Sequence, residues 1–276
     1  MCIFGGVSGH CKTTLLKKMK IENTAFDYDK FGQKYSGYRQ TDPRIAEYVF
    51  AALKNARTIL NVGAGAGSYE PTDKYVVAVE PSIVMRYQRL QNGKIPAINA
   101  KADNLPFDSD SFDASMAMIT VHHWPEIDKG LKELRRVTKE QVVIMTFDPE
   151  RLNIFWNAHY FPELIEVEKA RYPTIDFIKN ALGGNCEVVS IPIPLDCLDG
   201  FQEAFYGRPE AFLKKDVRLS QSAWGFLPKG VEEKLVKSLE DDLKSGEWDR
   251  KYGHFRTQPT LTCALRLIIS KPISNR

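Results

Sequence analysis

A short apolar run that ends in alternating glycines is the feature that most constrains the fold of this chain. Residues 58–62 (TILNV) are followed by Gly63-Ala64-Gly65-Ala66-Gly67. Glycine adopts positive φ angles and lets a ligand approach the backbone, and parallel α/β sheets bind ligands at the carboxyl ends of their strands. The run and the loop together predict the first strand of an α/β sheet with a cofactor site at its end.

Further apolar runs alternate with helical patterns, as in a parallel α/β domain. A covering helix is predicted over 128–137, and two late runs, 187–191 and 260–269, are predicted to form a closing antiparallel pair. The other strands are expected at 58–62, 75–79, 97–99, 114–119 and 141–146.

The remaining segments predict one domain over residues 25–276 behind a leader of 24 residues. A helical N-terminal cap is expected over 25–55, with Asp42-Pro43 as N-cap and first helical residue. Residues 195–258, rich in aromatic and charged side chains, are too long for an ordinary loop and predict a lid insertion. Within the leader, residues 6–13 resemble a phosphate-binding loop, but Cys11 replaces its second glycine, so nucleotide hydrolysis is not expected.

Composition favours a small-molecule partner. The chain has 38 Lys and Arg against 35 Asp and Glu, for a net charge of +3, without a long run of one sign. This balance argues against nucleic acid as partner, and no apolar run is long enough for membrane insertion. Five widely spread cysteines are typical of reduced thiols in a cytoplasmic protein, and their spacing predicts no metal site. The sequence makes no prediction of oligomeric state.

The glycine loop favours S-adenosylmethionine over a dinucleotide. The dinucleotide fingerprint needs G-x-G-x-x-G, whereas here Ser68 stands at the third glycine's place and Gly67 comes one residue early. The second predicted strand ends in Glu80, and a carboxylate there can accept hydrogen bonds from both hydroxyls of a ribose.

Four segments, ILNVGAGAGSYEP, VVAVEPSIVM, AKADNLPFDSDSFDASMAMITVHHW and GLKELRRV, resemble the type 11 family of class I methyltransferases. The resemblance covers about a third of the chain. It implies a Rossmann-like, mostly parallel sheet of seven strands with a terminal antiparallel hairpin, and S-adenosylmethionine as cofactor. The glycine loop would hold the methionine end, Glu80 the ribose, and Ala102 with Asp103 the adenine region. The expected cofactor-binding residues are Asn61, Gly63, Ala64, Gly65, Gly67, Glu80, Pro81, Ala102, Asp103 and Thr120.

Two departures from the family pattern bear on this site. Many members have Asp where this chain has Asn61, so the cofactor's ammonium would meet an amide, or Glu70 would take the place of the carboxylate. Only about a dozen residues separate the first two strands, so the first helix is predicted to be a turn at most.

His122 and His123 follow the fourth predicted strand on the same edge as the glycine loop. O-methyltransferases resembling this sequence carry a His pair here, with the first as general base, which implies catalysis by His122 and support by His123. A neutral imidazole suits proton removal near pH 7. The alternative is a structural role at the strand end, with His254 as another candidate base.

The predicted function is methyl transfer to a small-molecule acceptor, with oxygen favoured because of His122. Methylation of an isoprenoid or quinone-like acceptor at carbon is one alternative, and a non-catalytic module that binds S-adenosylmethionine is another. The predicted acceptor contacts are Tyr35, Arg39, Trp156 and Tyr160.

Overall fold

The computed structural model describes residue 29 and residues 37–273. The helices are α3 (Pro43–Leu53), α4 (Ile83–Gln91), α5 (Ile127–Arg136), α6 (Asn157–Tyr160), α7 (Pro162–Arg171), α8 (Ile175–Leu182), α9 (Lys215–Leu219), α10 (Val231–Ser245) and α11 (Glu247–Tyr252). The strands are β1 (Thr58–Val62), β2 (Tyr75–Val79), β3 (Phe112–Met118), β4 (Thr138–Phe147), β5 (Asn185–Ser190), β6 (Ile193–Pro194), β7 (Thr260–Leu261) and β8 (Leu265–Lys271).

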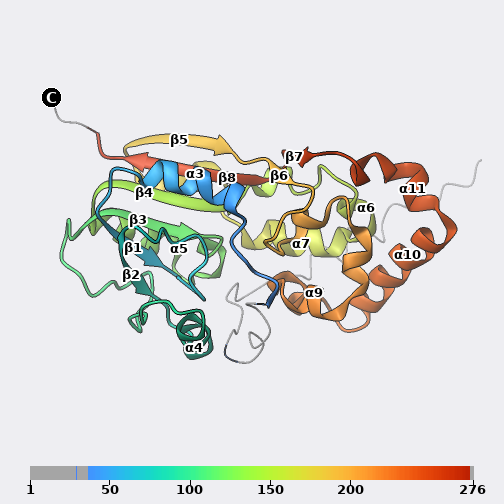
Figure 1. The fold of residues 1–276 in the computed structure, drawn as a ribbon, viewed down its shortest axis with the longest axis horizontal. Helices are drawn as coiled ribbons and strands as arrows, with labels where there is room; N and C mark the ends of the chain where they lie inside the picture. Colours follow the sequence, from blue (N-terminus) through green and yellow to red (C-terminus); the bar gives the residue numbers. More distant parts are fainter. Residues whose placement is uncertain (1–28, 30–36, 274–276) are drawn as a thin grey trace, which may run out of the picture.

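The main sheet has the strand order β2-β1-β3-β4-β8-β5 (Figure 1). Strands β2, β1, β3 and β4 run parallel, whereas β8 is antiparallel to both β4 and β5. The predicted α/β class, the parallel strands and the closing antiparallel pair are therefore confirmed.

The expectation of seven strands is wrong, because the main sheet has six in the part of the chain that the structure describes. Residues 97–99, predicted as a strand, make only an isolated bridge between Ile98 and Val79. Pro96, which precedes them, has no N–H to donate, and the chain turns again at a bridge between Lys101 and Asn104. The pairing is thus too short to count as a strand.

The predicted closing strand 260–269 is divided in two. Its first part, β7, pairs with β6 in a separate two-stranded sheet, and its second part, β8, pairs with β4 and β5. Because the two parts pair with strands of different sheets, the predicted strand is interrupted, at residues 262–264.

Alternating side chains of the strands bury the two faces of the sheet in two separate cores. In β1, Ile59 packs in the cluster that includes α3, whereas Leu60 packs in the cluster that includes α5 and α8. Helix α3 begins as predicted, with Pro43 in its first turn and the Asp42 carboxylate accepting from the Arg44 amide at 3.0 Å.

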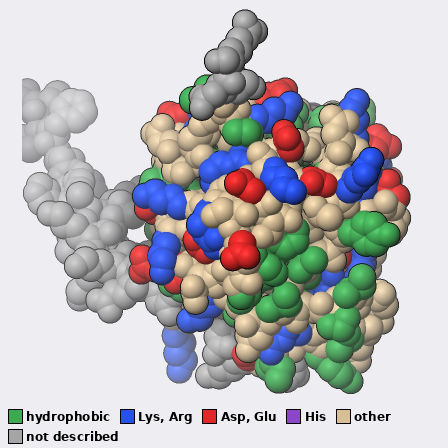
Figure 2. Space-filling view, turned by 90° about the vertical axis from the view of Figure 1, so that its left-hand side faces the viewer, with side chains coloured by type: hydrophobic (Ala, Val, Ile, Leu, Met, Phe, Trp, Pro, Cys, Tyr) green, Lys and Arg blue, Asp and Glu red, His purple; other side chains and the backbone are tan. Residues whose placement is uncertain are grey.

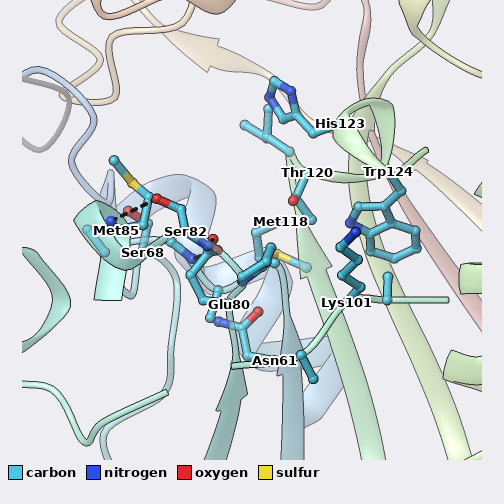
Figure 3. A pocket seen from close by; sticks show the side chains of 18 of the residues that line it. Asn61, Ser68, Glu80, Ser82, Met85, Lys101, Met118, Thr120, His123 and Trp124 are labelled. Carbon is cyan, nitrogen blue, oxygen red and sulfur yellow. Dashed lines mark hydrogen bonds between the residues drawn. The ribbon is translucent and has the colours of Figure 1, made fainter. Parts of the chain in front are cut away.

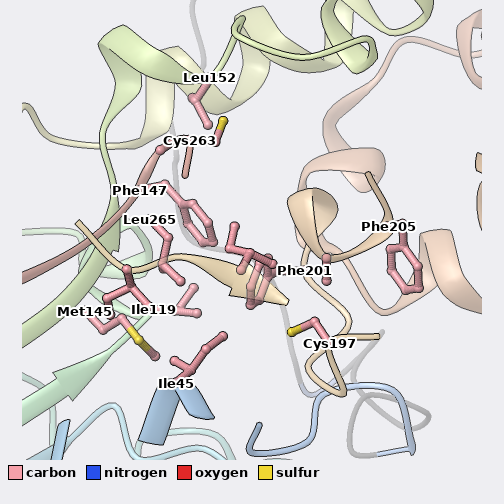
Figure 4. Packing of buried hydrophobic residues seen from close by; sticks show 14 of the residues in the cluster. Ile45, Ile119, Met145, Phe147, Leu152, Cys197, Phe201, Phe205, Cys263 and Leu265 are labelled. Carbon is pink, nitrogen blue, oxygen red and sulfur yellow. The ribbon is translucent and has the colours of Figure 1, made fainter. Parts of the chain in front are cut away.

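The α3 core continues into the insertion that lies between β6 and β7. Figure 4 shows it running from Ile45 of α3 past Met145 and Phe147 of β4 to Phe201 and Phe205. The insertion holds α9, α10 and α11 with four short 3₁₀ helices, and it lies with α6 and α7 beyond one end of the main sheet (Figure 1). Leu265 pairs with Phe147 at the carboxyl end of β4, so the insertion returns to the sheet at the edge that carries the glycine loop.

The surface and the termini add little to the site. Basic and acidic side chains are interspersed on the face shown in Figure 2, and hydrophobic side chains gather in the lower part of that view. None of the helices in the described residues combines the length and apolarity that a membrane crossing requires. The predicted leader, the phosphate-loop-like residues 6–13 and Tyr35 lie outside the described residues.

Candidate active site

The glycine loop lies at the carboxyl end of β1, where the backbone geometry excludes larger residues. Gly63 and Gly65 have φ angles of +68° and +51°, in the left-handed region that favours glycine. A Cβ at Gly63 would collide with the side chain of Thr120. The amides of Gly63 and Ala64 donate to the carbonyl of Val79 at 2.9 and 3.0 Å. These bonds fix the loop to the end of β2.

Gly67, the third glycine, serves packing and does not face the cavity beside the loop. Its φ angle is +95°, and a Cβ there would lie 2.9 Å from Lys94 Cγ and 3.0 Å from Arg89 Nη1. The prediction of Gly67 as a cofactor contact is therefore corrected: Gly67 leaves room for a buried ion pair behind the loop.

That ion pair joins Glu70 to Arg89. Arg89 donates through Nη1 and Nη2 to the two carboxylate oxygens of Glu70 at 2.7 and 2.9 Å, and Asn61 Nδ2 donates to Glu70 Oε1 at 2.8 Å. All three side chains are buried. Glu70 is thus turned away from the cavity, whereas Asn61 lines it with an Oδ1 that has no partner among the described residues.

The connection from β1 to β2 contains no helix in the structure, as its length predicts. A helix here would direct the positive end of its dipole at a ligand on the glycine loop. Ligand binding must instead use the backbone amides of the loop and the side chains around them.

Glu80 links the loop to the end of β2. Its Oε2 accepts from the Gly65 amide at 2.9 Å and its Oε1 from the Ser82 amide at 2.8 Å. Burial raises the pKa of this carboxyl group, and the two backbone bonds oppose that shift. Each carboxylate oxygen has a second lone pair for a ligand hydroxyl. Glu80 is therefore placed to contact a diol in the cavity.

A cavity of about 350 Å³, termed the larger cavity, opens beside the loop and Glu80 (Figure 3). This volume lies in the range typical of small-molecule sites. Sequence reasoning did not identify Ser68, Tyr69, Met85, Lys101 and Met118 in its wall. Of the ten predicted cofactor residues, the structure brings nine together in this wall: Asn61, Gly63, Ala64, Gly65, Glu80, Pro81, Ala102, Asp103 and Thr120.

The two histidines occupy a 3₁₀ turn, η2 (Val121–His123), directly after β3, with ring centroids 3.9 Å apart. His123 lines the larger cavity, and its Nδ1 accepts from Arg171 Nη2 at 3.1 Å. Because guanidinium only donates, a neutral His123 carries its proton on Nε2. Burial, followed by the positive charges of Arg171 and Arg39, lowers the pKa of His123 well below 6.5.

His122 faces a second, smaller cavity of about 30 Å³ and not the larger one. Its side chain stacks on Tyr172 with ring centroids 4.1 Å apart, and its Nδ1 is buried without a partner among the described residues. Burial and then the neighbouring His123, Arg171 and Arg39 lower the pKa of His122 well below 6.5. His122 is therefore held neutral, in the form that can accept a proton.

The wall of the smaller cavity combines polar side chains with apolar ones such as Phe147, Leu152 and Phe201. It contains Asn157, Glu168, Gln202 and Glu203, none of which the sequence identified. They come from α6, α7 and the insertion. Tertiary packing brings these four residues together, and no sequence motif predicts that they line one cavity. Arg39, Ile119 and His123 line both cavities, which places the two side by side.

Arg39, predicted to contact the acceptor, lies at this junction. Its Nε donates to Asp199 Oδ1 at 2.6 Å, and Tyr69 Oη donates to the other oxygen, Asp199 Oδ2, at 2.9 Å. The side chains of Arg39 and Asp199 are 11% and 2% exposed, so the ion pair is nearly dry. The N-terminal segment, the glycine loop and the insertion therefore meet at one carboxylate.

Two other predicted acceptor contacts do not reach either cavity, and that expectation is corrected here. Trp156 is 1% exposed, packs among aromatic rings, and donates from Nε1 to the Tyr206 carbonyl at 2.6 Å. Tyr160 donates to Asp242 Oδ2 at 2.7 Å. Both side chains pack the insertion against α6. His254, the alternative base, is exposed and outside both cavities.

The described residues contain no cluster of His, Cys, Asp or Glu that could hold a metal ion. Cys186, Cys197 and Cys263 are free thiols.

Comparison with known proteins identifies the domain. Residues 60–146 match the type 11 methyltransferase family model, described as a methyltransferase domain. Uncharacterized protein MJ1252 of Methanocaldococcus jannaschii is 24% identical over 132 residues, which are 47% of this chain and 53% of that protein. A malonyl-[acyl-carrier protein] O-methyltransferase of Halorhodospira halophila is 26% identical over 129 residues, 42% of this chain and 43% of the relative. The matches span about half the length of these curated relatives.

A solved structure matches more of the chain. It is an Anabaena variabilis protein described as a methyltransferase from an antibiotic biosynthesis pathway, with 28% identity and a TM-score of 0.76. The match covers 84% of this chain and 98% of that protein. The family match runs from β1 to β4 and so includes the glycine loop, Glu80 and the His pair. Residues 60–146 therefore contain a methyltransferase domain that matches the type 11 family, and the cofactor of this domain is S-adenosylmethionine.

Proposed function

We propose that this chain transfers a methyl group from S-adenosylmethionine to a hydroxyl group of a small molecule, with His122 as the general base. The observation that carries the proposal is the unpartnered Nδ1 of a buried, neutral His122 in a cavity beside the larger one.

The residues of the larger cavity fit the cofactor. When bound, S-adenosylmethionine supplies a methyl group on a sulfonium that is already activated for displacement. The unpartnered Oδ1 of Asn61 can accept from the cofactor's ammonium, and Glu80 can accept from its ribose hydroxyls. The positive φ angles of Gly63 and Gly65 let a ligand approach the loop closely, and Asp103, which lines the cavity, would contact the adenine region.

The chain's chemical contribution is to position the acceptor and to remove its proton. The Nδ1 of His122 accepts the proton of the acceptor's hydroxyl as that oxygen takes the methyl group. The packing of His122 on Tyr172 and His123 holds the ring in place. His123, with its proton on Nε2, can donate a hydrogen bond at the junction of the two cavities.

The chemistry of the smaller cavity favours a polar acceptor. Its carboxyl and amide groups would lose hydrogen bonds against an isoprenoid or quinone-like ring, so methylation at carbon is disfavoured. Two of the relatives agree with this choice. One is named a malonyl-[acyl-carrier protein] O-methyltransferase, so it acts at oxygen, and another is described as a methyltransferase from an antibiotic biosynthesis pathway.

The test has two stages. Calorimetry first measures binding of S-adenosylmethionine, and absence of binding at millimolar concentration would refute the proposal. A small-molecule extract is then incubated with the protein and cofactor carrying a labelled methyl group. We expect label in a small-molecule methyl ether, which survives treatment with base, and none in the absence of protein. Label on carbon or nitrogen alone would contradict an oxygen acceptor.

A further inference from the structure

Three residues that line the smaller cavity each carry a buried oxygen atom that accepts no hydrogen bond from the described residues. They are Asn157 Oδ1, Glu168 Oε2 and Glu203 Oε1, and their side chains belong to residues that are 2%, 9% and 3% exposed. An unpaired buried acceptor destabilises the folded protein, so three in one wall call for a ligand that donates hydrogen bonds.

A chain of side-chain amides fixes the direction of these acceptors. Asn157 Nδ2 donates to Gln202 Oε1 at 3.3 Å, and Gln202 Nε2 donates to Glu168 Oε1 at 3.0 Å. Both amides thus donate within the wall. Each amide uses one of its two N–H groups in this way, and the three oxygen atoms named above still accept no hydrogen bond from the described residues.

The charges around the cavity leave one carboxyl without a cation. Arg39 pairs with Asp199, and Arg171 Nη1 lies 3.7 Å from Glu168 Oε2. Glu203 forms no ion pair among the described residues, and burial raises its pKa to about 8. A cation in the cavity would supply the missing charge and favour the ionised form of Glu203.

We propose that the smaller cavity binds an ammonium group of the acceptor through Asn157, Glu168 and Glu203, so that the acceptor is a small amino alcohol. The inference rests on the proposed function, because His122 remains for the hydroxyl. Three N–H donors of a primary ammonium match three acceptors, whereas one water molecule donates only two hydrogen bonds. The volume of about 30 Å³ suits a group of this size.

The same arrangement explains a choice between two nucleophiles on one acceptor. A protonated amine has no lone pair, so an amine held as ammonium against Glu203 cannot take the methyl group. The hydroxyl can, because its proton passes to His122 Nδ1 while its oxygen bonds to the methyl carbon and S-adenosylhomocysteine leaves. The ammonium group anchors the acceptor and does not react.

Methylammonium tests the cavity directly, with methanol as its neutral counterpart. The protein is saturated with S-adenosylhomocysteine, and melting temperature is followed against each probe, with sodium chloride matching the ionic strength. We expect methylammonium but not methanol to stabilise the protein, and Glu203→Gln to weaken its binding at least tenfold. Glu210→Gln, a surface residue of the same insertion, should bind it unchanged. Equal effects of the two probes, or an unchanged Glu203→Gln, would show a structural water only and overturn the inference.

A transfer experiment separates this inference from the proposed function. The extract is divided on a cation exchanger, and each fraction is incubated with protein and labelled cofactor. Label confined to the retained, cationic fraction and lost in Glu203→Gln supports both. Label in the unretained fraction overturns the ammonium assignment and leaves methyl transfer in place. Binding of methylammonium without any methyl transfer refutes the proposed function and supports the cation site. If Glu203→Gln does not fold, Asn157→Leu removes another acceptor and is expected to weaken methylammonium binding in the same way.

Discussion

Arg39 and Asp199 form an ion pair, Nε to Oδ1 at 2.6 Å, across 160 positions of the chain. The two residues also form an antiparallel bridge, and the Gly200 amide donates to the Tyr38 carbonyl at 2.8 Å. Both side chains line the larger cavity. The pair therefore ties the N-terminal segment to the insertion at the wall of the cofactor site.

Asp199→Asn should weaken cofactor binding. The substitution keeps the size of the side chain but removes the charge that holds Arg39 and accepts from Tyr69 Oη. A charge-assisted hydrogen bond contributes about 1.5–3 kcal/mol, so we expect the Kd for S-adenosylmethionine to rise by about tenfold or more. Titration calorimetry measures this. Asp196→Asn, at the exposed pair with Arg44, is the control and should bind as wild type does. Equal affinities of the two variants would contradict the assigned role.

His122→Ala should slow turnover and leave cofactor affinity nearly unchanged. His122 lines the smaller cavity alone, so its loss removes the base without touching the larger cavity. General base catalysis contributes about 10²–10⁴-fold, and we expect a fall in kcat within that range. Single-turnover transfer of labelled methyl measures the chemical step. His159→Ala, in the outer packing with Tyr252, should retain full activity. A normal rate for His122→Ala would assign the residue a structural role.

Asn61→Asp should destabilise the protein, although Asp is common at this position in the family. Asn61 Nδ2 donates to Glu70 Oε1, and a carboxylate in its place would face another carboxylate at that distance in a buried site. We expect the free energy of unfolding to fall by about 1–3 kcal/mol, the cost of an unsatisfied buried group. Urea denaturation measures it. Asn104→Asp, in an exposed turn, is the control. Unchanged stability at position 61 would mean that Glu70 and Arg89 readjust freely.

Glu203→Gln should change how stability depends on pH. Burial raises the pKa of folded Glu203 from 4.5 to about 8, so the folded state holds this proton more tightly than the unfolded state. Stability from this group is present at low pH and is lost as pH rises from about 4.5 to 8, by about 1.4 kcal/mol per pH unit. The variant lacks this loss, so its advantage over wild type should grow across that range in urea denaturation. Glu210→Gln, at a surface carboxyl group, is the control, and its stability should depend on pH as that of wild type does. Parallel curves for Glu203→Gln and wild type would show that Glu203 titrates normally.

The sheet and the cofactor wall were largely predictable, because their signals are local. Strands 58–62 and 75–79 coincide with β1 and β2, and the glycine pattern places the loop between them. The strand predicted at 97–99 is absent, because three residues of suitable type do not show how many backbone hydrogen bonds the segment will make with its neighbour. Its single bridge at Ile98 depends on the turn that follows.

The smaller cavity was not predictable, because its wall is assembled from distant segments. Glu168 lies on α7 and Glu203 in a 3₁₀ turn of the insertion, and no pattern in the neighbouring sequence marks either side chain as part of a cavity. The opposite error occurred at Trp156. It was predicted to contact the acceptor, but in the structure it packs among other aromatic side chains. Side-chain type indicates chemistry only after the packing shows which way it faces.

The buried pair of Glu70 and Arg89 gives the glycine loop a particular response to temperature. No helix connects β1 to β2 after the loop, and this pair supports the loop instead, with Arg89 coming from α4. Hydration of charged groups becomes less favourable on warming, so the cost of keeping the pair out of water decreases. Heating therefore weakens the ion pair that supports the cofactor loop less than it weakens a hydrogen bond exposed to solvent. We expect the cofactor site to keep its conformation until the sheet itself unfolds.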